Sequence, residues 1–495
     1  MDLFYKSTRD SSVRITASQA VLKGLSADGG LFVPETIPAL DRDIDELAAM
    51  SYQETAYSVM KLFLTDFTEE ELKACIEAAY DEKFDTPEIA PIKEADGVYF
   101  LELFHGRTIA FKDMALSILP HLMTVSAKKN HVENEIVILT ATSGDTGKAA
   151  LAGFADVPGT RIMVFYPKDG VSPIQEKQMV TQKGANVKVI GIKGNFDDAQ
   201  TGVKAIFNDR ELAAKLDKEG FQFSSANSIN IGRLVPQIVY YVYAYAGLYA
   251  KGVIGKGAKL DVVVPTGNFG NILAAYYAKQ MGLPIGRLIC ASNDNKVLFD
   301  FFQTGVYDRN REFILTSSPS MDILISSNLE RLIYHIAGND AQADSELMKK
   351  LTETGRYEIT DGMREQLSDF YGGFATEEEA SLVLKSIFET SGYVIDPHTA
   401  VAACVSRKYR NESQSGAPVL VASTASPYKF THSVMKALGR DIEGLDDFET
   451  ADALCRISGV SIPQAVEEIR SAKVLHDTVV DIDGMEASVK EFLGV

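Results

Sequence analysis

The sequence predicts an α/β protein with mainly parallel β-structure covered by helices on both sides, and a separate amino-terminal module. The first observation is that apolar strand-like runs alternate with helical segments from about residue 98 onward. The second is that runs such as 136–141 are apolar almost throughout, as strands covered on both faces are. The third is the length of 495 residues, which exceeds one hydrophobic core and favours two or three domains.

Composition argues against several classes of protein. The net charge of −19 argues against nucleic-acid binding through a basic surface. The four cysteines lie far apart without paired spacing, which favours a reduced cytoplasmic protein without disulfides or a metal site. No secretory signal is visible at the start of the sequence. Residues 234–250 are the best candidate for a membrane span, but Pro236, Gln237 and a stripe of tyrosines predict a buried or interface helix instead.

Residues 1–95 are predicted to form the amino-terminal module. A short strand is followed by a glycine turn that leads into a second strand, which ends at Pro34. Residues 43–81 are predicted to be helical, because Ser51 and Thr68 are each followed three residues later by a glutamate, the spacing of a helix capping box. The module contains no catalytic constellation, so we expect it to supply packing and dimer contacts.

Residues 96–437 are predicted to hold the alternating strands and helices of the parallel β-structure. Within this region, 340–395 is rich in helix formers and charged residues and is predicted to be a helical insertion. Residues 438–495 are predicted to be mostly helical and carry no recognisable motif. Ligands of such folds bind at the carboxyl ends of strands, so the loops there are the candidate sites. Strands are expected at 98–103, 136–141, 161–166, 187–192, 259–265, 288–292 and 418–422.

Lys112 is the first candidate functional residue. It lies in the stretch 105–113, directly after Phe111 and among small and apolar residues. A buried ammonium group is disfavoured, so the pKa of this lysine should fall, and a neutral amine is a nucleophile toward an aldehyde. A single lysine is more commonly a solvated surface charge. The sequence context nevertheless predicts a lysine that forms a Schiff base.

Two glycine-containing turns follow predicted strands and lead into helices. The turn 142–147 brings hydroxyls and backbone N–H groups to a helix start, which suits a carboxylate or a phosphate. In 266–271, Gly267 and Gly270 allow the backbone to approach a phosphate closely. Such turns are common, so either could be a turn and nothing more. The sequence contains no Gly-x-Gly-x-x-Gly dinucleotide motif and no Gly-Lys-Ser/Thr phosphate loop.

Two further loops are candidates for ligand binding. The stretch 224–233 gathers serines and asparagines before Arg233, whose guanidinium can bind two oxygens of a phosphate or carboxylate at once. A polar loop with helix caps is the alternative interpretation. The stretch 423–430 follows a predicted strand, and a hydroxyl at that strand end could face a neutral ring nitrogen.

Together these motifs resemble the pyridoxal 5'-phosphate (PLP) enzymes of the tryptophan-synthase β fold type, fold type II. That fold type implies two mainly parallel-sheet αβα domains, here two interleaved subdomains within residues 96–437. More narrowly, they resemble the threonine synthase family in its longer bacterial and fungal form. The resemblance runs from about residue 5 to about residue 437. It is carried by the stretches 5–9, 29–34, 105–113, 142–147, 227–234, 267–271 and 423–425.

The resemblance implies a role for each motif. Lys112 would bind PLP covalently and act as the catalytic base, and Thr424 would hydrogen-bond the pyridine nitrogen. The PLP phosphate would be cradled by Gly267, Asn268, Phe269, Gly270 and Asn271. The substrate carboxylate would be surrounded by Thr142, Ser143, Asp145 and Thr146, and the substrate phosphate would be bound by Ser228, Asn230 and Arg233.

Asp145 departs from relatives of this fold type such as cysteine synthases, which carry asparagine there and use it to contact the ring oxygen of the cofactor. An ionised carboxylate beside that anionic oxygen would be unfavourable. We therefore expect Asp145 either to face the helix start or to be protonated. The longer threonine synthases share this aspartate.

The resemblance implies conversion of O-phospho-L-homoserine and water to L-threonine and phosphate, a lyase reaction of threonine biosynthesis, by a cytoplasmic monomer or homodimer. Lys112 would move protons at the α- and β-carbons, and Arg233 would stabilise the departing phosphate. A serine or threonine dehydratase or a β-replacement enzyme of the same fold is the enzyme alternative. A cofactor-binding scaffold or regulatory partner without turnover is the alternative from another class. His105 and His398 are predicted to be structural histidines.

Overall fold

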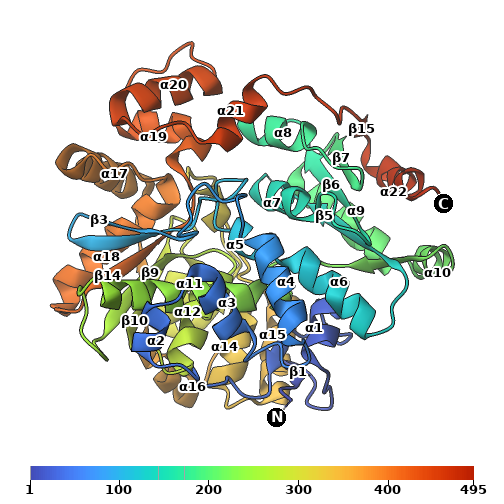
Figure 1. Cartoon of the computed structure of the whole chain (residues 1–495), viewed down its shortest axis with the longest axis horizontal. Helices are drawn as coiled ribbons and strands as arrows, with labels where there is room; N and C mark the ends of the chain where they lie inside the picture. Colours follow the sequence, from blue (N-terminus) through green and yellow to red (C-terminus); the bar gives the residue numbers. More distant parts are fainter. Residues whose placement is uncertain (1, 143, 172) are drawn as a thin grey trace.

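The computed structural model describes residues 2–142, 144–171 and 173–495, and it contains two large sheets (Figure 1). The first sheet has six strands, and all neighbours are parallel except the antiparallel pair at one edge, β3 and β4. Its strands in spatial order are β13 (Phe370–Phe374), β10 (Ile285–Ser292), β9 (Leu260–Pro265), β14 (Val419–Ser423), β4 (Val98–Glu102) and β3 (Ile92–Ala95).

The second sheet has five strands, all parallel, and lies beside the first. Its order is β15 (Val479–Val480), β7 (Val187–Ile192), β6 (Thr160–Pro167), β5 (Glu135–Ala141) and β8 (Phe221–Ser224). Every strand expected from an apolar run is present, and the fold class of two mainly parallel α/β units is confirmed.

Strand β5 shows why these runs are apolar on both faces. Successive side chains of a strand point to opposite faces of the sheet. Ile136 and Ile138 join the main core of the molecule, whereas Val137 and Leu139 join a separate cluster formed with α9 (Phe196–Asn208). All four are less than 5% exposed, because helices cover both faces.

Outside residues 340–395, the remaining helices between residues 96 and 437 follow the strands and cover the two sheets (Figure 1). They are α5 (Asp113–Leu116), α6 (Leu119–Lys129), α7 (Asp145–Phe154), α8 (Pro173–Val180), α10 (Arg210–Lys218), α11 (Ile231–Ala250), α12 (Gly270–Gln280), α13 (Val297–Thr304), α14 (Leu329–Ile336), α18 (Pro397–Ser413) and α19 (Thr431–Ala437).

The amino-terminal module pairs β1 (Tyr5–Ser7) with β2 (Phe32–Pro34) in an antiparallel ribbon. Both predicted capping boxes are present, since Ser51 and Thr68 each accept a hydrogen bond from the backbone of the glutamate three residues on. The helices of this module are α1 (Ala17–Lys23), α2 (Ile44–Ala48), α3 (Tyr52–Met60) and α4 (Glu69–Ala79).

Helix α11 is the predicted tyrosine-rich helix, and it is buried as expected. Both α2 and α3 pack against it. Tyr240 and Tyr241 are at most 1% exposed, and Tyr249 donates a hydrogen bond to Asp45 of the amino-terminal module. In the part of the chain that the structure describes, no helix is long and apolar enough to cross a membrane.

Residues 340–395 are mainly helical, as expected, but the stretch also contains two strands that the sequence did not reveal. Strand β13 forms one edge of the first sheet, and β12 (Arg356–Glu358) pairs with β11 (Val306–Asp308). Strand β13 could not be recognised in the sequence because it contains Gly372 and Gly373, and glycine is uncommon inside strands. Gly373 is required for packing, since an added Cβ would lie 2.5 Å from Val405 of α18. The helices here are α15 (Ala341–Thr354), α16 (Asp361–Glu365) and α17 (Glu377–Ser391).

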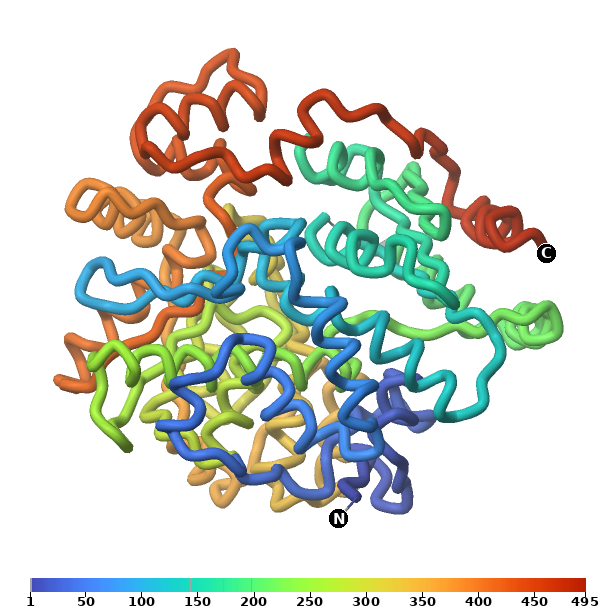
Figure 2. The backbone as a smooth tube through the Cα atoms, in the orientation of Figure 1, coloured from blue at the N-terminus to red at the C-terminus, as the bar shows by residue number. Residues whose placement is uncertain are grey.

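The carboxyl-terminal segment runs from the first sheet to the second (Figure 2). Its helices are α20 (Asp447–Ser458), α21 (Gln464–Arg470) and α22 (Met485–Leu493). Between α21 and α22, β15 adds to the edge of the second sheet beside β7. The segment is therefore mostly helical, as expected, with one short strand that the sequence did not reveal.

Candidate active site

The candidate site lies where the loops after β4, β9 and β14 of the first sheet meet the loops after β5 and β8 of the second. The lysine loop is held to the loop after β14 by two backbone hydrogen bonds. Phe111 N donates to Thr424 O across 2.8 Å, and Ser426 N donates to Ile109 O across 3.0 Å. Lys112 and Thr424 are thus neighbours, although they lie far apart in the sequence.

The loop before Lys112 is strained and tightly held. Ile109 has a φ of 51°, a left-handed conformation that is costly for a β-branched residue. Asp113 holds the loop from behind, because it accepts hydrogen bonds from the backbone N–H (2.8 Å) and the hydroxyl (2.6 Å) of Thr108. Asp113, for which the sequence suggested no role, is therefore a positioning residue for Lys112.

The Lys112 amine is largely buried among mixed charges, with the side chain 11% exposed. Its Nζ donates to Ser320 Oγ across 3.2 Å and lies 3.8 Å from Asp145 Oδ2. Burial lowers the pKa of Lys112 to about 8; Asp145 opposes this change, and the cations Lys429 and Arg233 add to it. The expectation of a buried lysine with a lowered pKa is confirmed.

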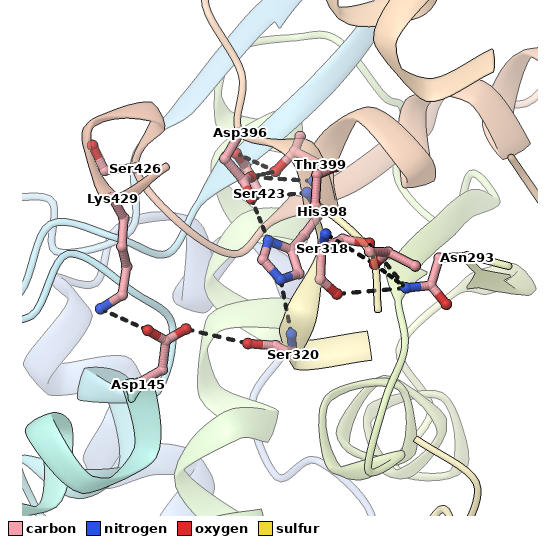
Figure 3. Close-up of polar contacts among 12 residues, drawn as sticks. Asp145, Asn293, Ser318, Ser320, Asp396, His398, Thr399, Ser423, Ser426 and Lys429 are labelled. Carbon is pink, nitrogen blue, oxygen red and sulfur yellow. Dashed lines mark hydrogen bonds and ion pairs between the residues drawn. The ribbon is translucent and has the colours of Figure 1, made fainter. Parts of the chain in front are cut away.

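Asp145 is the first residue of α7, and its carboxylate lies between two lysines. Lys429, whose side chain is fully buried, lies 3.2 Å from Asp145 Oδ1 (Figure 3). Gln175 donates to the same oxygen across 3.0 Å. Burial would raise the pKa of Asp145, but Lys429 and Lys112 outweigh it and hold this pKa well below its usual range. We therefore expect Asp145 to be ionised rather than protonated, with its charge balanced by the two lysines.

The start of α7 is capped by Thr142 instead. The Thr142 hydroxyl oxygen accepts hydrogen bonds from the backbone N–H groups of Gly144 (3.0 Å) and Gly147 (2.9 Å). Both of these hydrogen bonds use the hydroxyl oxygen as the acceptor. The hydroxyl proton of Thr142 therefore remains available for donation to a ligand. Thr146 is the second residue of α7 and is half-buried. Ser143, also predicted to bind the substrate carboxylate, lies outside the described residues.

The predicted phosphate loop, 267–271, joins β9 to α12. Phe269 adopts a left-handed φ of 65° and packs its ring near Phe302 and Phe370, so its side chain points into the core. Gly270 is the first residue of α12, whose N-terminal N–H groups favour an anion. The backbone carbonyl of Asn268 accepts hydrogen bonds from Asn328.

Asn271 has a donor available for a ligand. Its Oδ1 accepts hydrogen bonds from the hydroxyls of Tyr240 and Tyr241, which fixes the orientation of the amide. Its Nδ2 is buried and has no hydrogen-bond partner within the described part of the chain. An unpartnered buried donor is costly, and a bound anion would satisfy it.

In the loop after β8, three residues were predicted to bind the substrate phosphate. Arg233 is 3% exposed, and its Nε has no hydrogen-bond partner among the described residues. Burial lowers the pKa of Arg233 to about 10. Ser228 accepts a hydrogen bond from Asn328 (3.4 Å). Asn230 caps α11. Its side-chain amide hydrogen-bonds the backbone of Val21, Ser225 and Gly232 and so holds the loop in place.

Thr424 directly follows β14 and is 5% exposed. Its backbone carbonyl binds the lysine loop, and no hydrogen bond of its hydroxyl is seen among the described residues. The adjacent Ser423 hydroxyl lies 3.1 Å from the Thr399 hydroxyl at the start of α18. The Thr424 hydroxyl is therefore available to form a hydrogen bond with the ring of a bound ligand.

The sequence analysis missed several residues of the site. Ser320 and Lys429 contact Lys112 or Asp145 directly. Arg331 is fully buried and binds Asn328, the residue that contacts both Asn268 and Ser228. None of these residues lies in a motif with a recognisable spacing, and the strand-end position of Lys429 was the only available signal.

Both histidines have structural partners, as predicted. His105 bonds with Asp85 and Glu102. His398 is 2% exposed and lies between Asp396 and the backbone of Ser320.

Three family models match the chain in succession. Residues 4–80 match the threonine synthase N terminus, residues 84–425 match the pyridoxal-phosphate dependent enzymes, and residues 399–491 match the threonine synthase C-terminal family. Together these models cover both sheets and the segments on either side of them.

Comparison with individual proteins agrees with the family models. Human threonine synthase-like 1 is 42% identical over 85% of this chain, which spans 58% of that relative's length. A crystal structure of PLP-bound threonine synthase from Brucella melitensis superposes with a TM-score of 0.88 at 34% identity, covering 100% of both chains. Saccharomyces cerevisiae threonine synthase is 36% identical over 88% of this chain and 89% of its own length. The chain therefore belongs to the threonine synthase family of pyridoxal-phosphate-dependent enzymes.

Proposed function

We propose that the protein converts O-phospho-L-homoserine and water to L-threonine and phosphate, with PLP as its cofactor. The observation that carries this proposal is the Lys112 amine, which is buried, has a lowered pKa, and lies beside an ionised Asp145 where the motif loops meet. Membership of the threonine synthase family supports the same substrate and reaction.

The residues of the site fit PLP. Lys112 offers an amine that is readily deprotonated, as covalent attachment to an aldehyde requires. The loop Gly267, Asn268, Phe269, Gly270 and Asn271 offers helix N–H groups and the unpartnered Asn271 Nδ2 to a phosphate. Thr424 offers a hydroxyl to a neutral ring nitrogen.

The residues around Lys112 prepare it for proton transfer. PLP, when bound, supplies an electron sink that makes protons next to the substrate amine acidic. Lys112 takes and returns protons at the α- and β-carbons of the substrate, and a pKa near the operating pH suits both steps. Asp145 and Lys429 act through the amine, because they fix the charges around it.

The substrate is bound at its two ends. Thr142 and Thr146 bind its carboxylate at the start of α7. The resemblance adds Ser143, which lies outside the described residues. Asp145 is ionised and would repel that carboxylate, so we assign it to Lys112 and Lys429 instead. Arg233 and Ser228 bind the phosphate, and Asn230 shapes their loop. The free Arg233 Nε can stabilise the charge that develops as phosphate leaves.

The domain organisation, oligomeric state and localisation belong to the same proposal. We infer an amino-terminal module at 1–95, a catalytic region at 96–437 and a carboxyl-terminal segment at 438–495, acting as a monomer or homodimer. We propose that the protein is cytoplasmic and binds no nucleic acid, in keeping with its net charge of −19.

The test is phosphate release and threonine formation from O-phospho-L-homoserine by the PLP-loaded protein. Lys112→Ala should reduce turnover by at least about 100-fold, because general base catalysis contributes this much. Lys148→Met is the matched control, since Lys148 is also a buried lysine with a pKa lowered to about 8, and it hydrogen-bonds Gln182 instead. The control should stay within about tenfold of the wild type.

Each alternative has its own outcome in this test. Keto acid formation from threonine without threonine synthesis would support a dehydratase of the same fold. A protein that takes up PLP but turns over none of these substrates would support a scaffold. Full activity of Lys112→Ala would refute the mechanism.

A further inference from the structure

Ser320 contacts the side chain of Lys112, although it lies 208 residues later in the chain. It belongs to a short 3-10 turn, η1 (Pro319–Met321). Its hydroxyl contacts the Asp145 carboxylate across 3.2 Å (Figure 3). The same hydroxyl accepts a hydrogen bond from the Lys112 amine, also across 3.2 Å. Its backbone carbonyl lies against Gly267 of the phosphate loop so closely that a Cβ there would be 2.3 Å away. One residue thus joins the catalytic lysine to the phosphate loop.

The direction of the two hydroxyl hydrogen bonds follows from the charges. Asp145 is ionised and can only accept, so the Ser320 hydroxyl donates its proton to Asp145 Oδ2. Its oxygen then has lone pairs available for the Lys112 ammonium. The direct distance between Lys112 Nζ and Asp145 Oδ2 is 3.8 Å, longer than a hydrogen bond. The hydroxyl therefore bridges the cation and the anion.

A buried histidine fixes the Ser320 backbone. Ser320 N donates to His398 Nε2 across 3.1 Å, so that ring nitrogen is an acceptor. The other ring nitrogen, Nδ1, lies 2.7 Å from Asp396 Oδ2. Asp396 is the N-cap of α18 and also accepts from the backbone N–H groups of His398 (2.9 Å) and Thr399 (3.1 Å). The turn that carries Ser320 is thus attached to a rigid helix start.

We propose that Ser320 is a further catalytic residue of the proposed reaction, on which this inference rests, and that its hydroxyl sets the resting position of the free Lys112 amine between proton transfers. When a substrate C–H bond breaks and an N–H bond forms at Lys112, the new ammonium is held by Ser320 Oγ and by the charge of Asp145 behind it. The proton stays on Nζ until Lys112 returns it to the substrate. His398 and Asp396 are positioning residues that act through the Ser320 backbone.

The test compares three variants of the full-length protein. Ser320→Ala removes the bridging hydroxyl, and Ser320→Thr retains a hydroxyl. Ser317→Ala is the matched control, because Ser317 lies in the same loop and its hydroxyl donates to Glu377 instead (3.1 Å). All three should unfold at temperatures close to that of the wild type.

Turnover gives the first readout. Ser320→Ala should lower kcat by about 10- to 100-fold, with KM for the substrate changed by less than about threefold. This loss is smaller than the factor of about 100 to 10,000 typical of a group that transfers the proton itself, because Ser320 acts on Lys112. Ser320→Thr should recover much of this loss, and Ser317→Ala should remain within about twofold of the wild type.

The titration of the Lys112 amine gives a second readout that is independent of turnover. Its pH-dependent modification by an amine-directed reagent can be followed by mass spectrometry of the cofactor-free chain. Without the hydroxyl acceptor the ammonium is less stable, so the midpoint should move to lower pH in Ser320→Ala only. The other charged groups that act on this amine, Asp145, Lys429, Arg233 and Asp113, are the same in every variant.

The outcomes separate this inference from the proposed function. If Ser320→Ala leaves kcat and the midpoint unchanged, or if Ser317→Ala has the same effect, Ser320 only supports the loop and the inference is refuted. If the wild type releases no phosphate from phosphohomoserine, the proposed function fails, while the titration still decides whether Ser320 holds Lys112.

Discussion

The pairing of Asp145 with Lys429 makes a sharp prediction about stability. Lys429 is fully buried, and its amine has two partners, Asp145 (3.2 Å) and the backbone carbonyl of Thr108 (2.8 Å). Coulomb's law at an effective dielectric constant of about 20 gives about 5 kcal/mol for opposite charges at this distance. Breaking a buried ion pair by removing one partner typically costs about 3–5 kcal/mol. Asparagine retains one acceptor oxygen, so we expect Asp145→Asn to lower the free energy of unfolding by about 3 kcal/mol.

Urea titration followed by circular dichroism measures this loss. Asp369→Asn is the matched control, because Asp369 pairs with Lys279 across 2.7 Å but is 37% exposed, and a partly exposed pair is worth at most about 1 kcal/mol. The double variant Asp145→Asn with Lys429→Met removes both charges and should be more stable than Asp145→Asn alone. The reasoning is refuted if Asp145→Asn loses less than the control, or if the double variant gains nothing over the single one.

Three further predictions concern other contacts. Thr142→Val removes the acceptor for two backbone N–H groups at the start of α7 and should cost about 1–2 kcal/mol of stability, whereas Thr142→Ser should cost little; thermal unfolding of both variants checks this. Arg331→Met frees Asn328 from its guanidinium partner and so loosens the phosphate loop; we expect PLP to bind about tenfold more weakly, measured by fluorescence titration, and unchanged affinity would contradict this. Burial lowers the pKa of His105, but Asp85 and Glu102 outweigh it and raise this pKa to about 9. A raised pKa stabilises the fold below the unfolded value of about 6.5 and ceases to do so as the pH passes about 9. His105→Gln should therefore cost about 2 kcal/mol at pH 6 and almost nothing at pH 10, and an equal loss at both pH values would show that the charge is irrelevant.

The sequence predicted those parts of the molecule whose physics is local. Strand β5 was predictable because both of its faces are buried, which makes the run apolar at every position. The caps at Ser51 and Thr68 were predictable because donor and acceptor lie three residues apart. Lys112 was predictable because its own neighbours in the sequence are apolar.

Features that depend on distant contacts could not be predicted in this way. Strand β13 contains two glycines that fit closely against α18, and the reason for them is visible only once the sheet is formed. The ionisation of Asp145 depends on Lys429, which comes from the end of a different sheet. Ser320 reaches Lys112 across 208 residues, and no spacing rule links the two.

The order of strands in the first sheet has a consequence for synthesis of the chain. The second sheet, apart from β15, is made from the continuous stretch 135–224, so it can form early, from contacts between neighbouring segments. The first sheet cannot close until β14 emerges from the ribosome, because β14 lies between β4 and β9. Until then, β4 and β9, which are rich in valine, leucine and phenylalanine, each have an unpaired edge. Unpaired edges of apolar strands promote aggregation. The need for chaperones should therefore be greatest while residues 265–419 are being synthesised.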